Sequence, residues 1–167
     1  LGYTQFFRVK KGTFEGGDGM IIDGKVYIGS GTRTSPEAVK EIADYLRIPT
    51  YMVEIPKNGK HQEDMEIMHL DTFFMPLTDS KVIGCKDILR RCMIYDFQSG
   101  KRENLLEYLE RNFEVLDMPP EEQKKYAANM LVVEPGKVIV PSDYNFQTTK
   151  TLRDNGAKIR GQGLKEG

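Results

Sequence analysis

The sequence has few of the residues that build disulfide frameworks or metal centres, because it contains only two cysteines and two histidines. Cys85 and Cys92 lie seven residues apart in or near one apolar segment, a spacing that matches neither a disulfide framework nor a set of metal ligands. We therefore expect both cysteines to pack as small hydrophobic side chains in a reducing compartment. Nothing in the sequence indicates a cofactor.

Neither sign of charge is in excess. The chain has 24 Lys and Arg residues against 25 Asp and Glu residues, and no basic run is interleaved with aromatic residues. Nucleic acids and membrane surfaces are therefore not expected as partners. No apolar segment approaches the roughly 18 residues that span a bilayer, and residues 1–4 lack the basic start of a secretory signal. We expect a cytoplasmic protein.

The sequence does contain enough apolar residues for a core, since 39% of its 167 residues are hydrophobic. Three copies of a ββαβ pattern, at about residues 13–56, 68–117 and 127–160, predict an α/β fold. Their hairpin turns fall at residues 24, 80 and 136, so the period is 56 residues. Because one such unit leaves a sheet face and a helix face uncovered, the units are expected to stack on one another.

The first copy shows the pattern most clearly. Asp23-Gly24 is a tight-turn dipeptide between two short strands, and Ser35-Pro36-Glu37 has the composition of a helix start. Residues 56–67 are expected to form a polar loop that includes His61, to which we assign no role. The expected strands are 19–22, 26–29, 51–55, 68–77, 81–84, 113–116, 130–133, 138–140 and 157–159, and the expected helices begin near 36, 105 and 145.

The repeat places three polar segments at equivalent strand starts: Glu15 to Asp18, His69 to Asp71, and Ala127 to Asn129. In a radial arrangement these segments would converge on one mouth, where we expect a site. His69 and Asp71 are two residues apart in a predicted strand, so their side chains should share a face. Although a lone histidine is more often structural, a histidine flanked by carboxylates suits proton transfer next to a bound cation.

Glu15, Asp18 and Asp71 together suit a planar guanidinium, because a carboxylate accepts two of its N–H groups at once. The same set could bind a divalent metal, but hard-metal sites usually gather their oxygens within one loop, so we expect no metal. Arg33 precedes a predicted helix start, where it could receive a carboxylate, although a surface position or a salt bridge explains it equally well. Free arginine, or a close relative, carries a guanidinium at one end and a carboxylate at the other and would use both parts of this arrangement.

The chain resembles the guanidine-modifying enzyme superfamily, and most closely arginine deiminase, in segments that appear in the family's order. The resemblance covers about residues 13–159 and implies a pentein fold, an α/β propeller of five ββαβ modules, of which about three are present. The segments are Glu15-Gly16-Gly17-Asp18, Gly29-x-Gly31-Thr32-Arg33-Thr34-Ser35, His69-Leu70-Asp71-Thr72-x-Phe74, Ala128-Asn129-Met130-Leu131 and Pro135-Gly136.

The resemblance implies an enzyme of arginine metabolism in which a cysteine thiolate attacks the guanidinium carbon, ammonia leaves, and hydrolysis of the amidino-thioether gives citrulline. It implies that His69 is the general acid and base and that Asp71 grips the guanidinium nitrogens. It further implies that Glu15 orients the histidine and that Arg33 pairs with the substrate carboxylate. Asp18 would either touch the substrate or brace the loop.

The chain departs from the resembled family at the nucleophile. A glycine-rich His-Cys segment and an upstream Arg-Asp motif are missing, and neither Cys85 nor Cys92 lies in a glycine-rich turn or beside cations. We therefore expect an inner fragment of a larger enzyme, inactive alone, which associates with itself or with the missing modules because an incomplete fan exposes sheet edges. An amidinotransferase and a non-catalytic pentein that binds a partner remain alternatives.

Overall fold

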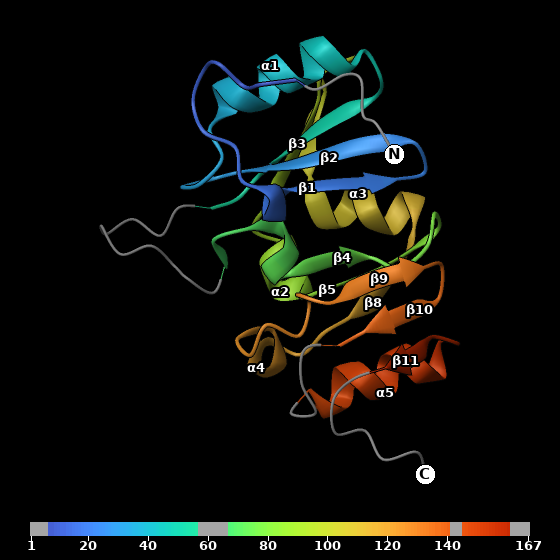
Figure 1. Cartoon of the computed structure of the whole chain (residues 1–167). Coiled ribbons are helices and arrows are strands. Elements are labelled where there is room, and N and C mark those ends of the chain that lie inside the picture. The colour runs from blue at the N-terminus through green and yellow to red at the C-terminus, as the bar shows by residue number, and fades with distance from the viewer. Residues whose placement is uncertain (1–6, 57–66, 141–144, 161–167) are drawn as a thin grey trace.

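The computed structural model describes residues 7–56, 67–140 and 145–160, which form a mixed α/β fold. Three β-sheets follow one another down the molecule, with α1 above the first and α5 below the last (Figure 1). None of the helices in these ranges combines the length and the apolar character that a bilayer crossing requires. The expected polar loop, with His61, lies almost entirely outside the described residues.

The first sheet has the strand order β1-β2-β3-β6-β7. Its opening hairpin is the predicted one, because Asp23 and Gly24 both have positive φ, as a tight turn between twisted strands requires. Helix α1 (Pro36–Leu46) begins where predicted, and the Ser35 hydroxyl accepts the N–H of Ala38. The strands are β1 (Gly19–Ile22), β2 (Lys25–Ser30), β3 (Thr50–Glu54), β6 (Met93–Asp96) and β7 (Arg102–Asn104).

The second sheet has the order β4-β5-β8, and helix α3 (Leu105–Asn112) precedes β8. Its strands are β4 (Phe74–Pro76), β5 (Lys81–Gly84) and β8 (Glu114–Asp117). Between β5 and α3 the chain forms helix α2 (Lys86–Leu89) and then β6 and β7, which extend the first sheet through β3. The sequence pattern did not predict this insertion.

The third sheet repeats the arrangement of the other two. Strands β9 and β10 form an antiparallel hairpin, and β10 pairs in parallel with β11, after helix α5 (Phe146–Asp154). A short helix, α4 (Pro120–Gln123), precedes this unit and was not predicted. The strands are β9 (Leu131–Glu134), β10 (Lys137–Ile139) and β11 (Lys158–Arg160).

The strand predicted over residues 68–77 is wrong in its first half. Only β4 pairs as a strand, and Leu70–Thr72 forms a single 3-10 turn, η3, with His69 as its N-cap. Local hydrogen bonds favour the turn, since the Thr72 hydroxyl donates to the His69 carbonyl and the Phe73 N–H donates to the Leu70 carbonyl. His69 and Asp71 therefore do not share a face through strand alternation. A second 3-10 turn, η1 (Gly16–Asp18), precedes β1 in the same way.

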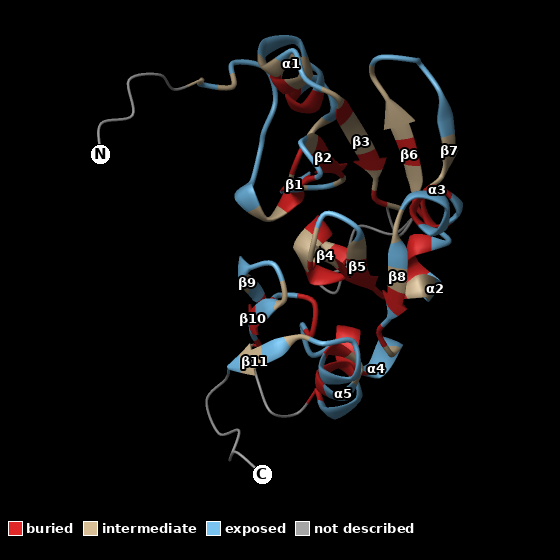
Figure 2. Cartoon of the chain, turned by 90° about the vertical axis from the view of Figure 1, so that its right-hand side faces the viewer, coloured by how far each residue is buried: buried red, intermediate tan, exposed pale blue. Residues whose placement is uncertain are grey.

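The hydrophobic core lies between the sheets and the inner faces of the helices, where buried residues gather (Figure 2). Its largest cluster joins the first two units. Cys85 and Cys92 are fully buried in this cluster, so their predicted packing as small hydrophobic side chains is confirmed.

Candidate active site

The turns η1 and η3 lie against each other at the starts of β1 and β4, and a carboxylate joins them. Asp18 at the end of η1 is buried, with 1% of its surface exposed. One of its oxygens accepts the N–H of Leu70 at 3.0 Å, and the other lies 3.1 Å from Nδ1 of His69. The side chain at the end of one turn therefore fixes both the backbone and the imidazole of the other.

Two further residues of the first unit hold Asp18 in place. The Thr34 hydroxyl donates to Oδ2 of Asp18 at 2.6 Å and accepts the N–H of Glu15 at 3.1 Å. A Cβ on Gly29 would lie only 2.5 Å from Oδ1 of Asp18, so the strand must carry a glycine for the carboxylate to fit. Asp18 is thus a buried carboxylate whose two oxygens both have partners, namely the Leu70 N–H on Oδ1, and the Thr34 hydroxyl and the His69 ring on Oδ2.

The second ring nitrogen of His69 faces Glu15. Nε2 lies 3.1 Å from Oε2 of Glu15, whereas the imidazole is only 15% exposed and Glu15 is about half exposed. Both contacts are hydrogen bonds from the ring when it is an imidazolium, since each nitrogen then carries a proton. Arg33 Nη1 lies 3.8 Å from the other oxygen of Glu15. His69 thus contacts the buried carboxylate of Asp18 through Nδ1 and the half-exposed carboxylate of Glu15 through Nε2.

Asp71 points to a different part of the site. Its Oδ2 accepts a hydrogen bond from Nδ2 of Asn129 at 3.0 Å. Burial raises the pKa of the Asp71 carboxyl, and the Asp18 charge adds to this, whereas the charge of His69 and the Asn129 hydrogen bond lower the pKa. The carboxylate remains partly accessible, which leaves it able to accept from a ligand.

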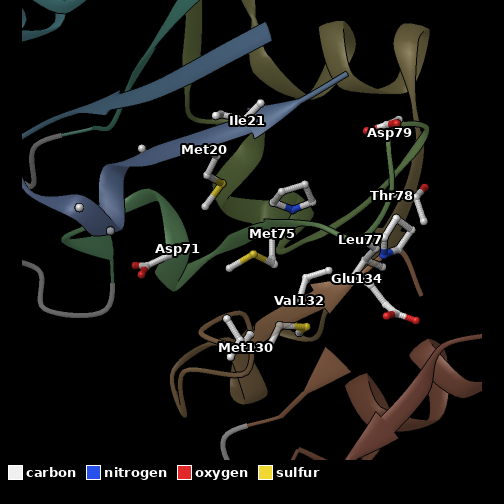
Figure 3. Close-up of a pocket in the computed structure, with 16 residues that line it drawn as sticks. Met20, Ile21, Asp71, Met75, Leu77, Thr78, Asp79, Met130, Val132 and Glu134 are labelled. Carbon is white, nitrogen blue, oxygen red and sulfur yellow. The ribbon is translucent and has the colours of Figure 1, made fainter. Parts of the chain in front are cut away.

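A cavity of about 440 Å³ begins at Asp71 and extends between the first strands of the three units. Three methionines line it, Met20 on β1, Met75 on β4 and Met130 just before β9, and they are spaced 55 residues apart in the sequence. Figure 3 shows Met20 and Met75 pointing toward each other, with Asp71 at one end of the cavity. The volume is in the range that holds small molecules.

The two cysteines lie elsewhere in the fold. Neither lines this cavity, and burial raises the pKa of both thiols, to about 12 for Cys92. A thiol with a raised pKa is a poor nucleophile because little thiolate forms. Within the described ranges, no group of three or more His, Cys, Asp or Glu side chains has the arrangement of a metal site.

The structure brings the predicted site residues together through contacts that the sequence did not show. Glu15, Asp18 and His69 form one network, Arg33 lies beside Glu15, and Asp71 lies at the neighbouring cavity. Sequence reasoning gave no role to Thr34 or to Asn129, although both stood within the segments that carried the resemblance. Their polar side chains within those segments, a hydroxyl next to Arg33 and an amide between Ala128 and Met130, were the available signals.

Comparisons with known proteins support a shared fold. An uncharacterized protein from Aeropyrum pernix is 28% identical over 149 residues, which cover 89% of this chain and 46% of the relative. DDAH from Pseudomonas aeruginosa, solved as a cysteine-to-serine mutant complexed with citrulline, is 23% identical with a TM-score of 0.66, over 90% of this chain and 49% of that chain.

A third comparison gives the same picture. The product-bound N-terminal domain of ArgZ, an arginine dihydrolase from the ornithine-ammonia cycle in cyanobacteria, is 19% identical with a TM-score of 0.65, over 90% of this chain and 50% of that chain. The chain thus spans about half the length of the relatives that it matches. The fold is that of the pentein structures. The family model described as arginine deiminase matches residues 4–165, nearly the whole sequence, and the chain therefore belongs to the arginine deiminase family.

Proposed function

We propose that this chain carries the acid-base and guanidinium-binding half of a hydrolase that converts arginine to citrulline and ammonia. The observation that supports this most directly is His69, which has a carboxylate oxygen 3.1 Å from each ring nitrogen and lies near a third carboxylate, Asp71. Such a site attracts a cation and supplies a proton donor beside it.

The proposed roles follow from exposure. Asp18 is buried and keeps the imidazole oriented, whereas Glu15 and Asp71 are accessible enough to meet a guanidinium. A ligand that displaces Glu15 from Nε2 would find a protonated ring nitrogen directed at it. Arg33 then pairs with the substrate carboxylate, a role for which its position next to the η1 turn is suitable.

The proposed reaction has two steps. A thiolate attacks the guanidinium carbon, the carbon–nitrogen bond breaks, and the leaving nitrogen takes the proton of His69 and departs as ammonia. The neutral His69 then removes a proton from water, which attacks the amidino carbon. The carbon–sulfur bond breaks and citrulline forms as the second proton of the water is lost to the solvent, which restores the thiolate and the imidazolium.

We infer that the thiolate comes from outside residues 1–167, because both cysteines of the chain are buried and have raised pKa values. In this proposal the three ββαβ units are part of a five-module propeller. Ile21 and Leu131 support it, since they are 72% and 62% exposed on strands that line the central cavity. The complete protein, or a second copy, would cover them.

The test uses the full-length protein incubated with arginine and glycine. Citrulline and ammonia are expected, and His69→Ala should abolish them. Ornithine together with guanidinoacetate would instead identify an amidinotransferase. If calorimetry detects no arginine binding and neither product forms, both enzymatic functions are overturned and a non-catalytic binding protein is favoured.

A further inference from the structure

The carboxylate of Asp71, in the second unit, packs against Gly17 of the first unit, where the absence of a side chain gives it room. A Cβ on Gly17 would stand 2.9 Å from Oδ2, 3.0 Å from Oδ1 and 3.1 Å from Cγ of Asp71. Gly17 does not have positive φ, so its backbone conformation suits any residue. Its neighbour Gly16 has the same freedom, but a Cβ there would meet no heavy atom within 4 Å. Space for Asp71 is therefore what distinguishes Gly17.

A residue of the third unit holds the same carboxylate from another direction. Nδ2 of Asn129 donates to Oδ2 of Asp71 at 3.0 Å. The segment that carries Asn129 is itself fixed, because the Asn129 N–H donates to the carbonyl of Tyr126, whose φ is 59°. From α4, Nε2 of Gln123 also donates to the carbonyl of Thr72 at 3.1 Å. The turn that contains Asp71 is thus tied twice to the segment before β9.

We propose that Gly17 and Asn129 are positioning residues that fix the Asp71 carboxylate for a guanidinium, an inference that rests on the proposed function. The amide of Asn129 occupies one side of Oδ2 and leaves Oδ1 open to a guanidinium N–H. Because the amide is neutral, it orients the carboxylate without cancelling its charge, whereas a lysine or an arginine at this position would compete with the substrate cation.

A titration tests the hydrogen bond without any substrate. The side-chain carboxyl carbon of Asp71 is followed by NMR in the full-length protein, with Asp71→Asn to assign the resonance. Asn129→Ala removes a donor to the ionised form, so the pKa of Asp71 should rise, while His69 and Asp18, the titratable groups that face it, are unchanged. The matched control is Asn155→Ala, whose exposed amide donates to Thr151 at 2.8 Å. An unchanged pKa in Asn129→Ala overturns the proposal.

Steady-state kinetics test the consequence. Asn129→Ala should raise KM for arginine roughly tenfold, because the hydrogen bond is to a charged group, and should move the acidic limb of kcat/KM to higher pH. Gly17→Ala should lower kcat/KM roughly 100-fold by displacing the carboxylate, and more than Gly16→Ala does. Equal losses in the two glycine variants, or an unchanged KM in Asn129→Ala, count against the positioning role.

The two proposals fail in different ways. If the wild-type protein neither binds arginine nor releases citrulline, the proposed function is overturned, and with it the guanidinium that Asp71 is positioned to meet. The titration still decides whether Asn129 holds the carboxylate. If Gly17→Ala does not fold, Asn129→Ala carries the test, because truncating an exposed side chain adds no atoms to the site.

Discussion

Two aspartates beside His69 differ in burial, and this difference separates their roles. Asp18 is 1% exposed, both of its oxygens have partners within the protein, and its burial keeps it from a substrate. Asp71 has one side-chain donor and lines the cavity. The bracing role for Asp18 is therefore the one that its contacts favour.

Asp18→Asn should lower kcat for citrulline formation roughly 100-fold, the scale of acid-base catalysis, with little change in KM. The substitution keeps the shape but replaces one acceptor oxygen with an N–H₂ group, which only donates. The contacts of Oδ2 with Thr34 and His69, or the contact of Oδ1 with the Leu70 N–H, are therefore lost. Initial rates of the full-length enzyme measure the effect. Asp23→Asn, in the exposed β1–β2 turn, is the control and should keep wild-type kcat. A raised KM with unchanged kcat would place Asp18 on the substrate instead.

Asp71→Asn should make the protein more stable near pH 7 while weakening arginine binding at least roughly tenfold. Burial raises the pKa of this carboxyl above 3.8, so the folded state disfavours its ionised form. The ionised carboxylate therefore lowers the free energy of unfolding as the pH rises through the folded pKa, and the neutral amide removes this cost. Thermal unfolding of the wild type and of Asp71→Asn near pH 7 and near pH 4 measures the difference in stability. The difference should be smaller at the lower pH, where Asp71 is increasingly protonated.

The residues of the site could be selected from the sequence, but their pairing could not. Glu15, Asp18, His69 and Asp71 were found because the repeat aligned the segments that contain them. Which carboxylate meets which ring nitrogen depends on the turns η1 and η3. The sequence pattern predicted neither turn, and it predicted a strand over the residues of η3. The Leu70 N–H is bound by Asp18, 52 residues earlier in the chain, and local propensity contains no information about such a contact.

At the level of elements, the β1–β2 turn and the start of α1 were predictable because each depends on neighbouring residues. Asp23-Gly24 sets its own turn, and Ser35 caps the helix that begins beside it. The insertion of β6 and β7 was missed because β6 pairs with β3, about forty residues earlier, and the pairing adds to a sheet that already satisfied the repeat.

Helix α5 receives its N-terminal cap from another element, and removing that cap should destabilise the third unit. Both oxygens of the buried Glu122 on α4 accept backbone N–H groups, those of Gln147 and Thr148, at 2.7 Å each. Glu122→Ala should lower the free energy of unfolding by about 2 kcal/mol, because the buried N–H of Thr148 and the part-buried N–H of Gln147 lose their partner. Urea denaturation measures this. Glu121→Ala, exposed on the same helix, should cost under about 0.5 kcal/mol.

At the scale of the whole molecule, the first strand of each unit is the outermost strand of its sheet, and all three line the same cavity. Apolar side chains on these strands and beside them are exposed. Ile21 is 72% exposed, Leu131 is 62% exposed and Val133 is 59% exposed. Leu131 also stands opposite Ile139, which is 43% exposed, in the β9–β10 hairpin. An apolar surface that lies next to unpaired strand edges favours association.

Residues 1–167 alone should therefore self-associate in a concentration-dependent way. A charge on the apolar edge, the surface formed by Ile21, Leu131 and Val133, should weaken the association. Leu131→Lys places a charge where association would bury it, at a cost that favours the monomer. The mass from light scattering over a dilution series measures the effect. Phe146→Lys is the matched control, since this side chain is 73% exposed but lies on α5, at the far side of the third sheet (Figure 1). A monodisperse wild-type monomer, or equal effects of the two lysines, would show that the apolar edge is not the contact surface.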